Sequence, residues 1–447
     1  MPGMLKKALF LQAYKSKYRN FMEMYEKALE LEIDDRSSIK AYQDKKLREL
    51  IEYCYENVPY YGKLFHDLGL RPRDVECAND LEKLPVMTKD TIRSHETDMT
   101  PKNLASQKYA YRETGGSTGD PLRYRVSHHD VQASWALLYT AWHKAGYEPG
   151  DSVAILGGAS LFPQTMSRLQ YRMKKFVLSH DFISSFDMGE ERRGEIVSRL
   201  ESYRPRYIGG FASSLYLLAR HLNDRSMGSR IRCDAVFSTA EVLFPFQREE
   251  MERAFDCRVF DQYGANDGGV SASECDRHKG MHVDVLRGIL EVVDEEGKQI
   301  AEGTGRILAT SFFNMAQPFV RYEVGDLGKI DGSICDCGRN TDLLMNIEGR
   351  ITDHLIFSNG RVVPGPVIVH LFRLFPQVRQ YQVVQKDAGS IDIMVVRGDG
   401  YDSGVEERLE DTLRESCGDA DMRFHLVESI PQARSGKWKF IIREYEP

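Results

Sequence analysis

The chain between residues 151 and 262 alternates short apolar runs with segments of helical length, and this alternation limits its possible folds more than any other feature. The apolar runs lie at residues 151–156, 207–210, 235–238 and 258–262. Strands that are joined by helices pair in parallel, because each crossover returns the chain to the same end of the sheet. We therefore expect an α/β fold whose mainly parallel sheet is covered by helices on both faces.

Two other regions have different patterns. Residues 1–60 predict helices, because apolar side chains recur at helical spacing, and Pro59 is expected to end the last of them. Residues 288–293 and 305–311 flank a turn at 294–297. This arrangement predicts an antiparallel β section after the parallel sheet.

The pattern changes again after residue 347. A hairpin over residues 381–396, an amphipathic helix over 405–416 and a strand over 424–427 predict a small α+β unit. Its length of about a hundred residues is normal for a domain. We therefore expect a large domain, residues 1–347, and a small domain, residues 348–447.

Composition excludes several classes of partner. The 447 residues carry a net charge of −7, so no basic surface for nucleic acid is expected. No apolar run approaches the roughly 20 residues of a membrane span, and the apolar patch after Lys6 and Lys7 is too short for a secretion signal. We expect a cytoplasmic monomer or homodimer with no membrane partner. Its eight cysteines are then thiols or metal ligands rather than disulfides.

A glycine- and hydroxyl-rich loop occupies residues 114–119. It contains three glycines and three hydroxyl residues, among them Ser117, Thr118 and Gly119. Glycine lets backbone N–H groups approach an anion, and short hydroxyls add donors without bulk. The loop is not a Walker A motif, yet it suits a triphosphate. The alternative is an exposed turn.

Two of the predicted strands run into polar turns. Ala240 and Glu241 come after one, and Asp261, Gln262 and Tyr263 lead out of the next. Ligands of open parallel sheets sit beyond the carboxyl ends of strands. Tyr263 can stack on a base, and Asp267, four residues on, can hold Mg²⁺ beside phosphates. Ordinary turns are the alternative for each.

Further candidates lie elsewhere along the chain. Asp326 follows a glycine in a predicted tight turn and can accept bonds from ribose hydroxyls, while an Asx turn is the alternative. Arg350 can reach a ribose or phosphate. Lys437, in a basic glycine loop near the end, can neutralise developing charge. An acid-binding pocket is expected near Gly158, Phe162 and Gly210, although core packing is equally open for Phe162.

Five motifs occur in a fixed order. Thr-Gly-Gly-Ser-Thr-Gly-x-Pro begins at residue 114, Tyr-Gly-x-x-acid at 263, Gly-Asp-Leu at 325, Gly-Arg-x-x-Asp at 349 and Ser-Gly-Lys at 435. This set resembles the adenylate-forming (acyl-CoA synthetase) superfamily. Residues 56–61, 84–89 and 237–241 resemble its phenylacetate–CoA ligase branch, including the capsule-biosynthesis-associated relatives. The resemblance runs from about Lys46 to Lys437.

The resemblance implies a fold and a set of roles. The fold is a large N-terminal adenylate-forming domain, with mixed sheets flanked by helices and a β section, followed by a small mobile C-terminal α+β domain. Thr118, Asp267 and Lys437 are the implied catalytic residues, with Asp267 on Mg²⁺. The implied ATP and AMP contacts are Ser117, Thr118, Gly119, Ala240, Glu241, Asp261, Gln262, Tyr263, Asp326 and Arg350.

The sequence departs from the family pattern at three places. Asp267 stands where the family usually has Glu. Asp120 and Leu122 flank Pro121 in the glycine loop, where a lysine is common, and Arg123 is the nearest replacement. Thr352 stands at the hinge position, commonly Asp or Lys.

Cysteine and histidine gather on either side of the β section. Cys275 and His278 form one close pair, Cys335 and Cys337 form another, and His282 lies near the first. Four such ligands fit a closed tetrahedral zinc site, and some relatives of the phenylacetate-ligase type carry zinc here. Free thiols are the alternative. The sequence does not decide which histidine completes the site.

The resemblance implies an AMP-forming acid–thiol ligase. It would activate a small carboxylic acid, aryl or similarly compact, as acyl-AMP with ATP and Mg²⁺, and transfer the acyl group to coenzyme A. One alternative is transfer to an amine, a hydroxyl or a carrier protein. Another is a nucleotide-binding regulatory protein with the same fold, which the retained Lys437 disfavours.

Overall fold

The computed structural model describes residues 12, 20–114, 121–157, 175–176, 178–186, 188–350, 354–418, 420–431 and 438–445. The described residues form two compact units. The first contains residues up to 347 except 325–327, and the second contains 325–327 and the residues from 348 onward. None of the described helices is both long and apolar enough to cross a membrane.

Five parallel strands form one part of an 11-stranded sheet, in the order β4-β3-β5-β6-β7. The strands are β3 Val153–Gly157, β4 His180–Ser184, β5 Tyr207–Phe211, β6 Ala235–Thr239 and β7 Arg258–Ala265. Helices α8 Glu190–Tyr203, α9 Ala212–Asp224 and α10 Pro245–Phe255 connect them. The predicted parallel α/β sheet is confirmed.

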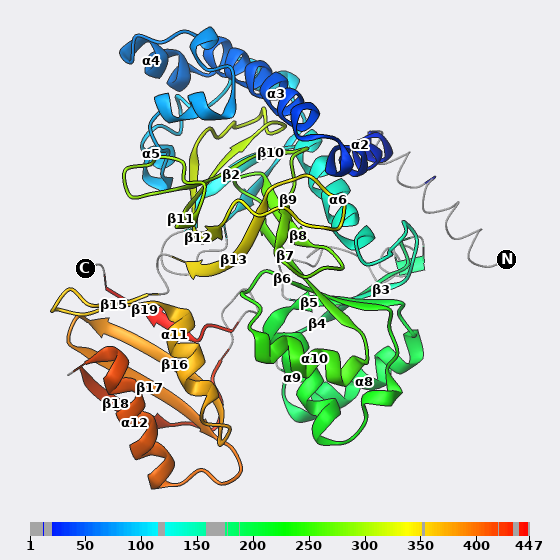
Figure 1. Ribbon diagram of the computed structural model, residues 1–447, viewed down its shortest axis with the longest axis vertical. Coiled ribbons are helices and arrows are strands. Elements are labelled where there is room, and N and C mark those ends of the chain that lie inside the picture. The colour runs from blue at the N-terminus through cyan, green and yellow to red at the C-terminus, as the bar shows by residue number, and fades with distance from the viewer. Residues whose placement is uncertain are drawn as a thin grey trace. The chain divides into compact units, whose positions relative to one another are not determined.

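Alternate residues of these strands enter two different cores. Ile208 and Val236 pack with α8, α9 and α10, which Figure 1 shows grouped together in green. Phe237 points to the other face and stacks on Trp142 of α6 (His128–His143), with ring centroids 5.4 Å apart. Both faces of the parallel strands are therefore covered, as residues buried on both sides of a sheet require.

Gly210 occupies a position in β5 that admits no side chain. A Cβ atom there would lie 2.3 Å from the carbonyl oxygen of Leu156 on β3. This close approach of two strands explains the glycine without any ligand.

The rest of the sheet is largely antiparallel and continues in the order β7-β8-β9-β13-β12-β11-β10. Its strands are β8 Val270–Glu274, β9 Met281–Val283, β10 Gly288–Val293, β11 Gly303–Ser311, β12 Tyr322–Ile330 and β13 Leu343–Arg350. The predicted antiparallel section at 288–311 is confirmed. The predicted tight turn before Asp326 is wrong, because Gly325 and Asp326 lie inside β12.

Helices and a hairpin complete the first unit. Helix α3 ends at Asn57, so the predicted end of this helix before Pro59 is confirmed. Pro59 itself stands in the first turn of a further helix, α4, which was not predicted. Proline is tolerated there, since the first helical N–H groups have no partner in the helix. The helices are α2 Phe21–Ile33, α3 Arg36–Asn57, α4 Pro59–Asp67 and α5 Lys89–Ser94, and the hairpin is β1 Tyr109–Glu113 with β2 Arg123–Ser127. Short 3₁₀ helices lie at Pro72–Asp74, Ala78–Lys83, Leu104–Ser106 and Gly228–Arg230.

The second unit has its own sheet and core. Its sheet has the order β18-β17-β16-β19, and a separate pair is formed by β14 and β15. The elements are β14 Leu355–Ile356, β15 Val362–Val363, α11 Gly365–Arg373, β16 Val378–Asp387, β17 Ser390–Arg397, α12 Ser403–Cys417, β18 Asp421–Leu426 and β19 Ile441–Arg443 (Figure 1). The predicted hairpin at 381–396 and the predicted helix at 405–416 are both confirmed.

Candidate active site

The loop after β6 turns back over the start of α9. Ala240 has a φ of 70°, a left-handed conformation that is uncommon for a residue with a side chain. One carboxylate oxygen of Glu241 accepts a hydrogen bond of 2.8 Å from the backbone N–H of Ser213. Glu241 therefore caps α9, whose N-terminal N–H groups favour a negative charge.

Asp261 stands on β7 within a cluster of charged side chains. Its N–H donates to Glu274 on β8 over 2.9 Å, and Glu274 accepts from Arg248 over 2.7 Å. Burial, and then the negative charge of Glu274, raise the pKa of Asp261 to about 7, against the opposing charge of Arg248. A carboxyl group of this kind carries a proton for part of the time at neutral pH.

Gln262 and Tyr263 follow Asp261 on the same strand. Thr239 of β6 is the direct neighbour of Gln262, and Ser238 is that of Asp261. The Nε2 atom of Gln262 is buried and has no hydrogen-bond partner among the described residues. The structure thus places all five predicted base contacts on, or just beyond, two neighbouring strand ends: Ala240, Glu241, Asp261, Gln262 and Tyr263.

Asp267 lies in the short loop between β7 and β8. The hydroxyl of Tyr322 on β12 donates to one of its carboxylate oxygens over 3.0 Å. Gly268 packs so closely that a Cβ atom would lie 2.6 Å from that of Ala309, and Gly269 has a φ of 73°. The glycines after Asp267 therefore let this loop press against β11.

A buried ion pair supports the same loop. Arg287 donates to Asp130 over 2.8 and 2.6 Å and also to the carbonyl oxygen of Asn266 over 3.2 Å. A planar guanidinium that bonds both carboxylate oxygens fixes orientation as well as distance. The pair thereby fastens the residue that precedes Asp267.

Asp326 and Arg350 meet within the second unit. The Nε atom of Arg350 lies 3.4 Å from a carboxylate oxygen of Asp326. Both groups are part-buried, at 35% and 14% side-chain exposure. The structure therefore brings the two predicted ribose contacts together.

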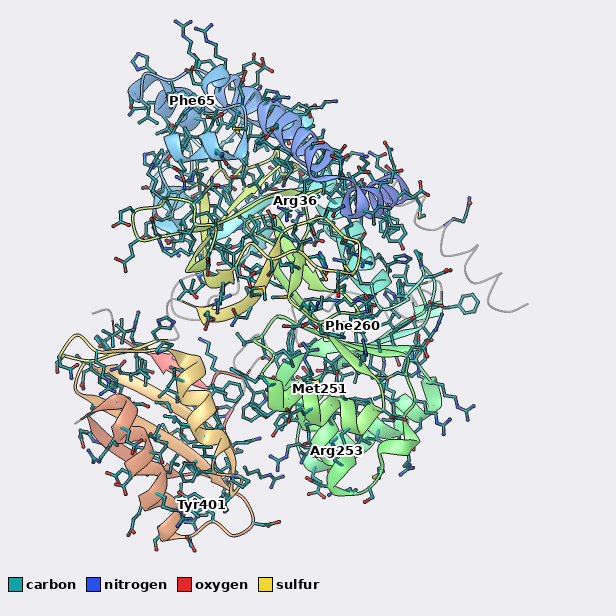
Figure 2. The ribbon with its side chains drawn as sticks, in the orientation of Figure 1. Arg36, Phe65, Met251, Arg253, Phe260 and Tyr401 are labelled. Atoms are coloured by element: carbon teal, nitrogen blue, oxygen red, sulfur yellow. The ribbon has the colours of Figure 1, made fainter. Side chains whose placement is uncertain are left out.

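Four of the five predicted metal ligands form one group: Cys275, His282, Cys335 and Cys337, whose ligand atoms all lie within 4.8 Å of one another. His282 Nε2 is 3.3 Å from the sulfur of Cys337, and its Nδ1 is 3.2 Å from the Thr341 hydroxyl. His278 is not in the group. Its Nδ1 lies 3.0 Å from Glu274, and its ring packs 4.8 Å from that of Phe260, which Figure 2 labels.

Glu32 attaches helix α2 to the segment that follows Cys335 and Cys337. The carboxylate of Glu32 accepts from Arg339 over 2.9 Å and pairs with Lys144 over 2.8 Å. The N–H of Asn340 donates to the carbonyl oxygen of Glu32 over 2.9 Å. The two residues that directly follow Gly338, just after Cys337, are therefore tied to α2 through Glu32.

Some predicted site residues lie outside the described residues: Ser117, Thr118, Gly119, Gly158, Phe162 and Lys437. Gly210 is described, and its place in β5 is explained by strand packing alone. The charged supports Asp130, Arg248, Glu274 and Arg287 were not predicted. Each contacts a partner distant in the sequence, and no local motif marks such a pair.

The chain was compared with protein families and with curated proteins. Residues 355–444 match the family model of the CapK C-terminal domain. Protein CapK of Staphylococcus aureus is 24% identical over 404 residues, which are 90% of this chain and 88% of CapK. A phenylacetate–coenzyme A ligase of Thermus thermophilus is 25% identical over 407 residues, 89% of each chain.

The fold is also similar to that of solved CoA ligase structures. A 2-hydroxyisobutyryl-CoA ligase in the postadenylation state, in complex with 2-HIB-AMP, superposes with a TM-score of 0.74 at 17% identity and covers 92% of this chain and 91% of its own. The predicted resemblance is confirmed. The chain is thus a homologue of CapK and the phenylacetate–coenzyme A ligases, with the fold of the adenylate-forming CoA ligases and a CapK C-terminal domain.

Proposed function

We propose that the protein is an ATP-dependent, AMP-forming ligase that activates a carboxylic acid and transfers it to coenzyme A. The carboxylate attacks the α-phosphate of ATP, acyl-AMP forms and pyrophosphate leaves. The thiol of coenzyme A then attacks the acyl carbon and AMP leaves. The observation that carries the proposal is the match to a phenylacetate–coenzyme A ligase over 89% of both chains.

The residues at the strand ends supply binding and orientation. We assign the base contacts to Ala240, Glu241, Asp261, Gln262 and Tyr263, the ribose contacts to Asp326 and Arg350, and the triphosphate contacts to Ser117, Thr118 and Gly119. Lys437 stabilises the charge that develops on the α-phosphate. Catalysis of this kind depends mostly on positioning and electrostatic stabilisation.

Asp267 is the carboxylate that we assign to Mg²⁺. A hard cation prefers oxygen ligands, and the Tyr322 hydroxyl holds one carboxylate oxygen of Asp267 in a fixed direction. When bound, Mg²⁺ neutralises charge on the phosphate oxygens. The buried Arg287 keeps the Asp267 loop in place through Asn266.

We propose that Cys275, His282, Cys335 and Cys337 hold a structural zinc ion. Two sulfurs that are each about 2.3 Å from a tetrahedral zinc lie about 3.8 Å apart. The Cys275 and Cys335 sulfurs are 3.7 Å apart, which fits. Four protein ligands leave no open position, so this ion would stabilise the fold and take no part in the reaction.

The substrate that we propose is a compact acid, aryl or of similar size. It would lie near Gly158, Phe162 and Gly210, close to the carboxyl ends of β3 and β5, where ligands of parallel sheets bind. Its identity is the main question for experiment.

The test is ATP–pyrophosphate exchange with a panel of aryl and short-chain acids, followed by addition of coenzyme A or hydroxylamine. We expect exchange with at least one acid and a thioester with coenzyme A. Exchange without a thioester would favour an amine, hydroxyl or carrier-protein acceptor. ATP binding without exchange for any acid would favour a nucleotide-binding regulatory protein.

A further inference from the structure

Two cysteines meet at the amino ends of the neighbouring parallel strands β6 and β7. Cys233 lies two positions before β6, and Cys257 directly precedes β7. Their sulfur atoms are 3.4 Å apart, and both thiols are free. The pair lies at the opposite end of β6 from Ala240 and Glu241, so neither the proposed base site nor the proposed zinc group uses it.

The strand register gives the two backbones a separation that suits a disulfide. Ala235 is directly opposite Arg258, so Cys233 and Cys257 are offset by one position. Strands about 4.8 Å apart, with a rise of about 3.3 Å per residue, then place the two Cα atoms roughly 6 Å apart. Disulfides span Cα separations of about 4.4–6.8 Å. The sulfurs must approach from 3.4 Å to about 2.05 Å, a change that side-chain torsions can supply.

The residues that follow the two cysteines are fastened to other parts of the same unit. The N–H of Asp234 donates to the carbonyl oxygen of Arg206 over 2.7 Å. The guanidinium of Arg258 donates to the carbonyl oxygen of Asp276 over 2.7 Å. Both cysteines are thus held beside each other by their neighbours, and no large movement of the backbone is needed for the thiols to react.

Both thiols are half-buried, at the edge of the core that α8, α9 and α10 share with the parallel strands. A thiol can be oxidised only where an oxidant can reach its sulfur. The other cysteines outside the proposed zinc group differ in this respect or have another partner. Cys54 and Cys417 are buried, and the sulfur of Cys77 donates to Asp80 over 3.2 Å.

We propose that Cys233 and Cys257 are a redox-modification site, at which a reversible disulfide clips the turn after α10 to the start of β6. The oxidant is a small disulfide such as oxidised glutathione. One protein thiolate attacks it, forms a mixed disulfide and releases one glutathione thiol. The second protein thiol loses its proton, attacks the protein sulfur of the mixed disulfide and releases the second glutathione thiol. Two protein thiols become one disulfide, while the oxidant becomes two thiols.

The test treats the full-length protein with oxidised glutathione, alkylates the remaining thiols and digests the protein with trypsin without reductant. The hydrogen bond between the sulfurs, and then burial, raise the pKa of the Cys233 thiol, so the reaction is run at about pH 8.5 to favour thiolates. Trypsin separates residues 233–248 from residues 254–258, because an arginine precedes and ends each peptide. We expect the two peptides to be linked, with a mass about 2 Da below their sum. Dithiothreitol should separate them again.

Three variants serve as controls. Cys233→Ser and Cys257→Ser should each abolish the linked peptide, whereas Cys77→Ser, at another half-buried cysteine, should keep it. The oxidised wild type should unfold about 2–6 °C above the reduced protein, because a link between residues 24 positions apart restricts the unfolded chain. Cys233→Ser, treated in the same way, should show no such rise.

Three results would overturn the proposal. In the first, native wild type yields no peptide that links Cys233 to Cys257, or yields mainly links from these residues to other cysteines. In the second, the link forms no faster in the native protein than in protein unfolded by urea, so the fold does not bring the thiols together. In the third, the linked protein unfolds at or below the temperature of the reduced protein, so closing the bond distorts β6 and β7. None of these measurements depends on a nucleotide or an acid.

Discussion

Arg287 and Asp130 form a bidentate ion pair in the interior of the large unit, with N–O distances of 2.8 and 2.6 Å and side chains that are each 2% exposed. Removing one partner leaves the other charge buried and unpaired. We therefore expect Arg287→Met to lower the free energy of unfolding by roughly 3–5 kcal/mol. Urea denaturation of the wild type and the variant measures this change in the free energy of unfolding.

The double variant Arg287→Met/Asp130→Leu is the matched control for this prediction. It removes both charges, so much of the lost stability should return. Lys27→Ala, which breaks an exposed pair with Glu30, should change stability by less than about 1 kcal/mol. An Arg287→Met protein as stable as wild type would show that Asp130 gains water or another partner.

Glu241 can be separated into a structural and a nucleotide-binding role. Because its carboxylate caps α9, Glu241→Ala should lower the free energy of unfolding by about 0.5–2 kcal/mol. Glu241→Gln keeps an acceptor oxygen, so its free energy of unfolding should fall by less than that of Glu241→Ala. If the affinity for AMP is unchanged in both variants, Glu241 is only a helix cap and its assignment to the base site is wrong.

Asp261 should give the protein a measurable pH dependence. Its folded-state pKa of about 7 exceeds the unfolded value near 3.9, so the folded state binds more protons between these pH values. The contribution of the protonated Asp261 carboxyl group to the free energy of unfolding is therefore complete below about pH 4. It is lost as the pH rises to about 7. The stability of wild type relative to Asp261→Asn should fall across this window by at most about 1.4 kcal/mol per pH unit and then level off.

The neighbour of Asp261 provides a check on the cause. Glu274→Gln removes a negative charge that raises the pKa of Asp261. The loss of stability that accompanies deprotonation of Asp261 should then level off at a lower pH. Denaturant unfolding at several pH values measures both effects. A difference between wild type and Asp261→Asn that stays flat from pH 4 to pH 8 would mean that the pKa of Asp261 is not raised.

The two histidines near the cysteines give a direct test of the metal site. Purified without added zinc, the wild type should contain about one zinc per chain by elemental analysis, because a closed site has four protein ligands. His282→Ala should lose most of it, and His278→Ala should keep it, since His278 faces Glu274. An unchanged zinc content in His282→Ala, or no zinc in the wild type, would contradict the assignment.

Lys437 tests the proposed adenylation step. Lys437→Ala should lower ATP–pyrophosphate exchange by on the order of 100-fold or more, the size of a lost charge-stabilising contact in a transition state. The thermal unfolding temperature should match wild type. If exchange survives, Lys439 becomes the candidate.

The parallel strands and the antiparallel section could be predicted because their patterns are local. A strand buried on both faces is a continuous apolar run, and the turn at 294–297 is marked by a glycine. The end of α3 before Pro59 could be predicted because proline is disfavoured inside a helix. The start of α4 at Pro59 could not, because tertiary packing decides whether a new helix begins there. The sequence predicts a turn at Asp326 because a glycine precedes it and glycine often marks turns. Gly325 does have a positive φ, but a strand also tolerates this conformation at glycine.

The candidate site was predictable as far as its motifs extend. Asp261, Gln262 and Tyr263 follow one strand, so their common position depends on the sheet alone. The pair of Asp130 and Arg287 spans 157 positions, and no periodicity links such residues. The choice between His278 and His282 likewise depends on which imidazole faces the cysteines, a property of the folded backbone.

The attachment of Glu32 to Arg339 has a consequence for synthesis on the ribosome. The two residues are 307 positions apart. At 5–20 residues per second, roughly 15 to 60 s separate the emergence of α2 from that of its last partner. Lys144 can neutralise Glu32 early, but the contact that closes over α2 forms only when three quarters of the chain exists. Until then, Lys144 is the partner through which the nascent chain can neutralise the Glu32 carboxylate.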